Sequence, residues 1–337
     1  MKRWHVWIGA LVSAIFLWLA LRGLKLAAVW DSMQAANYLW LIPAVLVYFA
    51  AVWARTWRWD YMLRPLKRIP LGRLFPVVVI GYMGNNVYPL RAGELLRSYV
   101  LRRREDVPMG ASLATVIVER VFDGLVMLVF VFVALPFTPI PSQNLRALVI
   151  VASVAFFGAL AVFFALAAMP HRTLRLVDWT SERFLPRPLR RPLLDFSHRF
   201  LAGLESLRSF RNVLMIFLTS VVIWLLETVK YWFVLQAFPF EVSFFALMLM
   251  NGVVNLATTL PSAPGYVGTF DAPGIAILVL YGVERGAAGA YTLVLHAALW
   301  LPITLLGAIY MVREGLSWAD FGRAAERRVA LGQDLQD

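Results

Sequence analysis

The sequence predicts an all-α integral membrane protein that crosses the bilayer several times. Apolar residues make up 61% of its 337 residues and charged residues only 15%, a balance that ordinary soluble domains do not have. A bilayer core is roughly 30 Å thick, so a spanning helix needs about 20 mostly apolar residues. We interpret six apolar runs as full spans, namely residues 4–20, 38–53, 111–135, 145–169, 213–237 and 288–312.

The composition argues against several other classes of protein. The chain has no cysteine, which excludes disulfides, thiolate metal sites and a cysteine nucleophile. Its four histidines lie far apart, without metal-ligand spacing, so we expect neither a metal nor another cofactor. The net charge of +12 is better explained by basic loops beside anionic lipid than by a nucleic-acid partner.

Basic residues are concentrated in a few connecting segments, which indicates that these segments face the cytoplasm. The segments are residues 55–73, 97–105, 170–212 and the tail 313–337. The connections at 136–144 and 239–242 carry one charge between them, on Glu241, and are assigned to the outside. This path places both termini in the cytoplasm and the protein in the cytoplasmic (inner) membrane.

The path requires a re-entrant hairpin in the first half of the chain. The apolar residues 74–87 lie between two cytoplasmic segments, so the chain must enter and leave the membrane by one face. Pro89 and Gly93 interrupt the helix here and free backbone groups. Such a break is tolerated at membrane depth only where protein shields it.

The second half repeats this arrangement from the outside. Residues 244–260 and 273–281 are apolar, and the break between them contains Pro261, Pro264, Gly265 and Gly268. The prediction is therefore six full spans plus two re-entrant helical hairpins in one membrane domain, residues 1–337. Its halves, 38–135 and 213–312, form inverted repeats, a pattern that indicates a transport site at the midplane. Eight or nine ordinary spans are the alternative.

Residues 170–212 contain leucine and phenylalanine at helical intervals among many arginines. This pattern predicts a basic amphipathic helix on an anionic membrane surface. A docking surface for a soluble partner is the alternative.

The first break combines polar residues that are unusual at membrane depth. Asn85, Asn86, Arg91, Glu94 and Arg97 lie within it or just after it. Guanidinium groups match phosphate with a fork of donors, so we expect Arg91 and Arg97 to bind a headgroup phosphate. Glu94 is expected to position Arg91 or to accept a headgroup amine. An internal, purely structural Arg–Glu pair is the alternative.

The span at 111–135 carries Glu119, Arg120 and Asp123. Each charge inside a span costs about 2.5–3.5 kcal/mol on insertion scales, so such residues usually pair in the protein interior. We expect Arg120 to pair with Asp123 and Glu119 to meet Arg91 or Arg97. A structural clamp between this span and the hairpin explains the same residues.

The second half has fewer ionisable candidates. Glu227 and Lys230 are one helical turn apart and either neutralise each other or couple transport to an ion. Asn255 lies on the helix before the second break, on one face with Asn251 four residues earlier. Asp271 follows the break, where a helix N-terminus would suit an anion or be capped by Asp271 itself. His296 is interpreted as a buried, hydrogen-bonded histidine rather than a proton carrier.

Three motifs in this order give the chain a family resemblance. They are Asn86-x-x-Pro89-x-Arg91-x-Gly93-Glu94-x-x-Arg97, Val118-Glu119-Arg120-Val121-Phe122-Asp123 and Pro264-Gly265-Tyr266-Val267-Gly268-Thr269-Phe270-Asp271. Together they resemble the membrane (flippase) domain of lysylphosphatidylglycerol synthases/flippases. The resemblance implies a lipid flippase fold with Arg91, Glu94, Glu119, Arg120 and Asp271 near the lipid path. No synthase domain follows in this sequence, so aminoacyl transfer is not expected.

The sequence therefore predicts a non-enzymatic transporter of membrane lipids. We expect its substrate to be a phospholipid or a polyprenyl-phosphate-linked lipid with an anionic headgroup. One alternative is a non-transporting subunit of a lipid-modifying enzyme or glycosyltransferase. The other is a membrane-embedded enzyme acting on lipid phosphates, for which no histidine lies near the arginines.

Overall fold

The computed structural model describes residues 4–88, 91–134, 169–184, 187–204, 209–260 and 262–315, with scattered positions within 137–165 and at 207. All regular structure in these residues is helical, which confirms the all-α class. The expected span at 145–169 lies largely outside the described residues. Pro89, Pro261 and the tail beyond residue 315 lie outside them as well.

Three helices of the described chain are long and apolar enough to cross a membrane. They are α3 (Leu41–Leu63), which continues the short 3-10 helix Tyr38–Trp40, α10 (Phe210–Leu235) and α13 (Arg285–Arg313). The first expected span is instead a bent pair, α1 (Trp4–Leu21) and α2 (Leu26–Gln34), with 79° between Leu11–Leu21 and α2. The span predicted at 111–135 corresponds to α6 (Met109–Ala134), whose three charged side chains all find partners.

Two pairs of shorter helices lie where the breaks were predicted. The first hairpin is α4 (Leu71–Val87) and α5 (Ala92–Glu105), and the second is α11 (Phe244–Ala257) and α12 (Asp271–Leu280) with the 3-10 helix η3 (Pro264–Tyr266) between them. Each of these helices is shorter than the roughly 20 residues that a full span needs. That each hairpin enters and leaves by one face stays a prediction.

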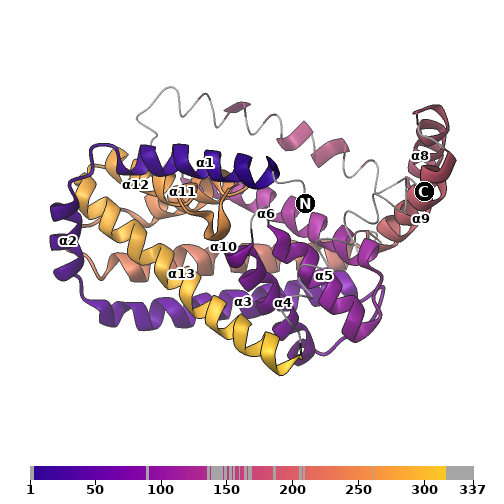
Figure 1. Ribbon diagram of the computed structural model, residues 1–337, viewed down its shortest axis with the longest axis horizontal. Coiled ribbons are helices and arrows are strands. Elements are labelled where there is room, and N and C mark those ends of the chain that lie inside the picture. The colour runs from indigo at the N-terminus through magenta and orange to yellow at the C-terminus, as the bar shows by residue number, and fades with distance from the viewer. Residues whose placement is uncertain are drawn as a thin grey trace.

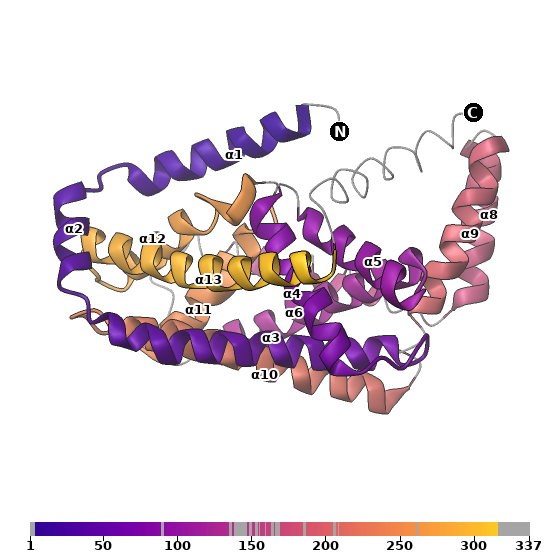
Figure 2. The same ribbon diagram turned by 60° about the horizontal axis from the view of Figure 1, so that its bottom comes forward.

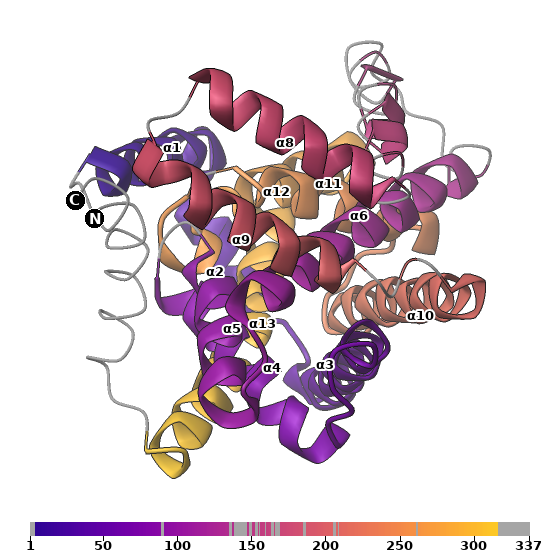
Figure 3. The same cartoon turned by 90° about the vertical axis from the view of Figure 1, so that its right-hand side faces the viewer.

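The helices pack in a pattern that is the same for both halves of the chain. The long helices α3 and α10 lie side by side along one side of the molecule (Figures 2 and 3). Around them α4 packs on α13 and α11 on α6, while α5 packs on α6 and α12 on α13. Each contact has its counterpart when α3, α4, α5 and α6 are exchanged for α10, α11, α12 and α13. Inverted repeats would produce this pattern, and the repeats themselves stay a prediction.

The first hairpin depends on a close approach between its two helices. A side chain on Gly93 would collide with the carbonyl oxygen of Gly81 and come within 2.5 Å of the backbone nitrogen of Asn85. Only glycine therefore allows this crossing, as in tightly packed membrane helices. Because α5 begins at Ala92, Gly93 lies inside the helix and does not break it, which corrects the prediction.

Helix ends in the second half are capped by local side chains. Ser243 accepts a hydrogen bond from the Ala246 N–H at the start of α11 (3.1 Å), and Glu284 accepts one from the Ala287 N–H at the start of α13 (3.0 Å). The N–H groups of Gly286 and Ala287 hold the pKa of Glu284 below its ordinary value. Both caps lie where the connections from the preceding helix end.

The basic segment forms a helical pair, α8 (Pro170–Phe184) and α9 (Arg187–Gly203), at one end of the molecule (Figure 1). α9 packs on α6, and α8 packs on α9. Leu174 and Val177 are partly covered, whereas Leu176 and Trp179 are exposed between arginines. Because α10 begins at Phe210, the segment ends three residues before the predicted boundary. Its position on a membrane surface stays a prediction.

Candidate functional site

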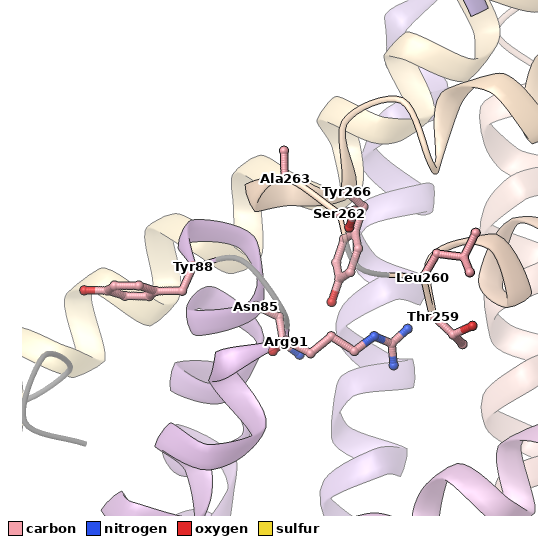
Figure 4. A pocket seen from close by; sticks show the side chains of 8 residues that line it. All are labelled: Asn85, Tyr88, Arg91, Thr259, Leu260, Ser262, Ala263 and Tyr266. Atoms are coloured by element: carbon pink, nitrogen blue, oxygen red, sulfur yellow. The ribbon is translucent and has the colours of Figure 1, made fainter. Parts of the chain in front are cut away.

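A pocket lies between the tips of the two helical hairpins (Figure 4). Its volume is about 170 Å³, and both hairpins contribute to its walls. The lining residues are Asn85, Tyr88, Arg91, Thr259, Leu260, Ser262, Ala263 and Tyr266. The tyrosine ring of position 88 points away from the other side chains, whereas Arg91 extends toward the second hairpin (Figure 4). We call this space the inter-hairpin pocket.

Among the residues that the structure describes, Arg91 is the only charged one that lines the inter-hairpin pocket. Its guanidinium donates to the carbonyl oxygen of Thr258 at 3.2 and 3.3 Å and to the hydroxyl of the same residue at 3.4 Å. The carboxylate of Glu94 lies 3.8 Å away, which is beyond a hydrogen bond. The ring centroid of Tyr266 lies 5.7 Å from the guanidinium carbon, within the range of a cation–π contact.

The backbone is strained on both sides of this pocket. Arg91 has a φ of +52° and Tyr266 a φ of +61°, in the left-handed region that bulky residues rarely adopt. Such conformations cost about 1–3 kcal/mol and cluster at functional sites. One strained residue precedes α5 and the other ends η3, so each hairpin tip contributes one strained residue to the pocket.

Below the pocket, a buried charge network centres on Arg58 of α3. Its guanidinium is fully buried and donates to Glu119 at 2.8 Å, to Asp123 at 2.5 Å and to the hydroxyl of Ser220 at 2.8 Å. The indole of Trp224 donates to the same oxygen of Asp123 at 3.0 Å. One side chain therefore ties α3 to α6 and α10 by charge-assisted bonds.

The network continues from Glu119 to the first hairpin. Arg97 donates to Glu119 at 2.6 Å and lies 4.4 Å above the ring of Trp59. Arg120 lies 3.4 Å from Asp123 and 3.4 Å from Glu94. The expected pairs Arg120–Asp123 and Glu119–Arg97 are thus present, and Arg91 is not the partner of Glu119.

A second, smaller cavity separates the network from the inter-hairpin pocket. Its volume is about 10 Å³, and its walls include Tyr82, Glu94, Arg97 and Arg120. Asn85 lines both spaces, and its side-chain oxygen is buried without a hydrogen-bond partner in the described structure. Buried polar atoms normally have a partner, so Asn85 retains an unused hydrogen-bond acceptor.

Glu227 and Lys230 form the expected ion pair, and a third residue joins them. Arg55 of α3 also pairs with Glu227, so two cations share one carboxylate. Lys230 also lies 4.8 Å from the ring centroid of Tyr48. Among the residues that the structure describes, no group of three or more His, Cys, Asp or Glu is placed to hold a metal ion.

Residues 6–307 match the family model described as the lysylphosphatidylglycerol synthase TM region. The chain belongs to this family. The match covers every helix of the site, from α3 to most of α13. The three sequence motifs of the resemblance lie within it, and parts of all three contribute residues around the inter-hairpin pocket or the buried network.

Relatives of this chain include other membrane proteins. A UPF0104 membrane protein of Methanothermobacter thermautotrophicus is 25% identical over 304 residues, which cover 83% of this chain and 84% of the relative. A UPF0104 membrane protein of Methanocaldococcus jannaschii is 23% identical over 266 residues, covering 76% of this chain and 79% of the relative. Glycosyltransferase AglD of Haloferax volcanii is 27% identical over 308 residues, which cover 79% of this chain but 48% of AglD.

Three residues predicted to bind substrate lie outside both the inter-hairpin pocket and the buried charge network. Asn86 donates to Thr304 at 2.9 Å and to the carbonyl of Trp300 at 3.3 Å on α13. Asn255 donates to the backbone of the preceding helical turn at 2.8 Å. Asp271 pairs with His296 at 2.8 Å. The lipid-binding roles of all the predicted residues stay predictions.

Two arginines that lie outside the predicted site are buried in the structure. Arg55 and Arg58 were assigned to a cytoplasmic loop, whereas α3 continues to Leu63 and encloses both. The sequence does indicate that the helix extends past residue 53. The two arginines are three residues apart, and Trp59 and Met62 continue the apolar face. Thr258, Thr259, Ser262 and Tyr266 were also missed, since only the fold brings them opposite Arg91.

Proposed function

We propose that this member of the family moves a lipid with an anionic, phosphate-containing headgroup between the leaflets of the cytoplasmic membrane. The observation that carries the proposal is the projection of Arg91 into a pocket formed by two hairpin tips. A guanidinium presents a fork of donors that suits phosphate. The partners of Arg91 described above are one backbone carbonyl, one hydroxyl and a distant carboxylate, which leaves donors for a headgroup.

The charge of the surrounding network favours an anionic ligand. Four cations, Arg58, Arg91, Arg97 and Arg120, face three carboxylates, Glu94, Glu119 and Asp123. The group of Arg55, Lys230 and Glu227 adds one more positive charge. Buried charge is costly unless it is compensated. A phosphate in the inter-hairpin pocket would supply the missing negative charge, and Asn85 and Ser262 would offer further polar contacts.

The position of the pocket supports transport. It lies where two helical hairpins meet, and the predicted inverted repeats make these hairpins approach from opposite faces of the membrane. Movement of one hairpin at a time would open the pocket to one leaflet and then to the other. The proposal assigns no covalent step, and it places both termini on the cytoplasmic side, as the basic segments indicate.

The lipids that co-purify with the protein test this assignment. We would purify the full chain, Arg91→Ala and Arg102→Ala in mild detergent and identify their lipids by mass spectrometry. Arg102 is a matched control because it lies exposed at the other end of α5. We expect one phosphate-bearing lipid to be enriched on the native protein and on Arg102→Ala, and lost from Arg91→Ala. Bulk membrane lipids in equal proportions on all three proteins would refute the headgroup site.

A second candidate function rests on the α8–α9 pair. It exposes Leu176 and Trp179 at the end of the molecule, and the relative AglD is named a glycosyltransferase and is about twice as long as its matched part. A subunit that presents this pair to a lipid-modifying enzyme would explain both observations. Purification with a stoichiometric enzyme, together with full function of Arg91→Ala, would favour this account over transport.

A further inference from the structure

His296 lies in the middle of α13 with both ring nitrogens occupied. Its Nδ1 is 2.8 Å from a carboxylate oxygen of Asp271, and its Nε2 is 2.7 Å from the carbonyl oxygen of Gly265. The residue is 11 positions after the start of α13 at Arg285, or about 16 Å along the helix at 1.5 Å per residue. This depth is about half of a bilayer core.

These two contacts require a bound proton. A carbonyl oxygen only accepts, so Nε2 must carry a hydrogen. A neutral imidazole would then present a lone pair from Nδ1 to the carboxylate of Asp271, and two acceptors repel each other. Either Nδ1 is also protonated or Asp271 is a carboxylic acid, and in both cases the pair holds one proton more than a neutral histidine beside an aspartate.

We propose that His296 and Asp271 form a proton-binding site that couples proton binding and release to movement of the second hairpin. The inference rests on the proposed function, because the movement in question is the opening of the inter-hairpin pocket. Loss of the proton would leave a buried negative charge on Asp271 facing a lone pair of the ring. That arrangement is unfavourable in a low-dielectric site, so the contacts with α13 would separate.

The second hairpin contacts His296 of α13 through Gly265, the residue before Tyr266 of the pocket wall. Gly265 has a φ of +71°, and a side chain there would come within 2.8 Å of the Trp300 indole nitrogen. Trp300 also donates to the carbonyl of Asn86 on the first hairpin at 3.4 Å. One stretch of α13 therefore holds both hairpin tips.

The groups around His296 leave Asp271 as its ionisable partner. The other carboxylate oxygen of Asp271 accepts from the Gly268 N–H at 2.9 Å, and the Phe270 ring lies 4.5 Å from the imidazole between centroids. From α1, the Ser13 hydroxyl accepts a hydrogen bond from the Ala263 N–H at this hairpin tip. From the described part of α4, the Asn86 carbonyl accepts from Trp300. Tyr266, which follows Gly265 in the chain, faces Arg91 across the pocket.

Glu227 is less suited to the same role. Arg55 and Lys230 both pair with it, and two neighbouring cations keep a carboxylate ionised. Asp271 has one titratable neighbour, which changes charge itself. We therefore assign the proton site to the His296–Asp271 pair rather than to Glu227.

Proteoliposomes with an imposed pH gradient test the coupling. We would follow the transfer of fluorescent phosphatidylglycerol between leaflets for the full chain, His296→Gln, Asp271→Asn and the control His171→Gln, whose residue is exposed on α8. Reversing the gradient should change the rate severalfold for the native protein and His171→Gln. For His296→Gln and Asp271→Asn, the transfer rate should be the same in both directions of the gradient. A gradient response in these two variants that equals the native one would overturn the proposal.

A proton count separates this inference from the proposed function. The native protein and His296→Gln would be unfolded at pH 8 in weak buffer with a pH indicator. At this pH a free aspartate and a free histidine hold almost no proton between them, so the native protein should release about one proton more per chain than the variant. Equal release refutes the proton site even if lipid is moved. An extra proton without lipid transfer refutes the proposed function and retains the site.

Discussion

The guanidinium carbon of Arg91 lies 5.7 Å from the ring centroid of Tyr266, so the tips of the two helical hairpins meet across the pocket. Both residues have left-handed backbone conformations. Neither residue lies inside a helix, because Arg91 precedes α5 and Tyr266 ends η3. The contact therefore joins two strained chain breaks that lie far apart in the sequence, and it places a cation where a headgroup is expected.

Removal of Arg58 should destabilise the membrane domain strongly. Arg58→Met leaves Glu119 and Asp123 without the guanidinium that bridges them, and breaking a buried ion pair in this way costs about 3–5 kcal/mol. We expect this loss in the free energy of unfolding, measured by tryptophan fluorescence in detergent. The control Arg64→Met breaks a pair with Asp60 whose arginine is 39% exposed, and it should cost less than about 1 kcal/mol. Equal losses would show that Arg58 is not the centre of the network.

The close crossing in the first hairpin predicts opposite effects for two glycines of that hairpin. Gly93→Ala forces a side chain against the Gly81 carbonyl, and we expect it to cost about 1–3 kcal/mol. Gly72→Ala meets nothing within 4 Å at the start of α4, so it should be neutral or stabilising by up to about 1 kcal/mol. Thermal unfolding of both variants provides the comparison. A harmless Gly93→Ala would mean that the helices are further apart than described.

The two hairpins should label from opposite faces of the membrane. The chain has no cysteine, so single cysteines can be introduced at Gly72 and Arg102 for the first hairpin and at Glu241 and Glu284 for the second. We expect an impermeant thiol reagent to label the first two from the cytoplasmic side and the last two from the other side. If the two cysteines of one hairpin are labelled from different faces of the membrane, its helices are ordinary spans and the re-entrant prediction is wrong. A cysteine at Tyr88 that labels only from outside would indicate two full crossings.

Much of the architecture was predictable from residue pattern alone. Long apolar runs identified α3, α10 and α13 because a bilayer imposes their length, and proline and glycine marked the second break. The charges of α6 were predicted to pair, since unpaired charges at membrane depth are costly. The pairs Arg120–Asp123 and Arg97–Glu119 follow that expectation.

The remaining features depend on three-dimensional packing. Arg55 and Arg58 were assigned to a cytoplasmic loop because basic residues are enriched in such loops. The carboxylates that pair with them lie on other helices, far away in the sequence. Gly93 was read as a helix breaker, although its role is a contact with α4 that the sequence does not show. Thr258 and Tyr266 meet Arg91 only because the two hairpins converge in the fold, although Thr258 lies 167 positions after Arg91 in the sequence.

The most direct test of the central claim is the transfer of a phosphate-bearing lipid between leaflets. Fluorescent phosphatidylglycerol would be quenched from outside in proteoliposomes that contain the full chain, Arg91→Ala or Arg102→Ala, with fluorescent glucosylceramide as a probe without phosphate. We predict that the native protein and Arg102→Ala expose inner-leaflet phosphatidylglycerol to the quencher, that Arg91→Ala slows this about tenfold or more, and that glucosylceramide is not moved. A native rate equal to that of protein-free vesicles, or an Arg91→Ala rate equal to the native one, would contradict the account.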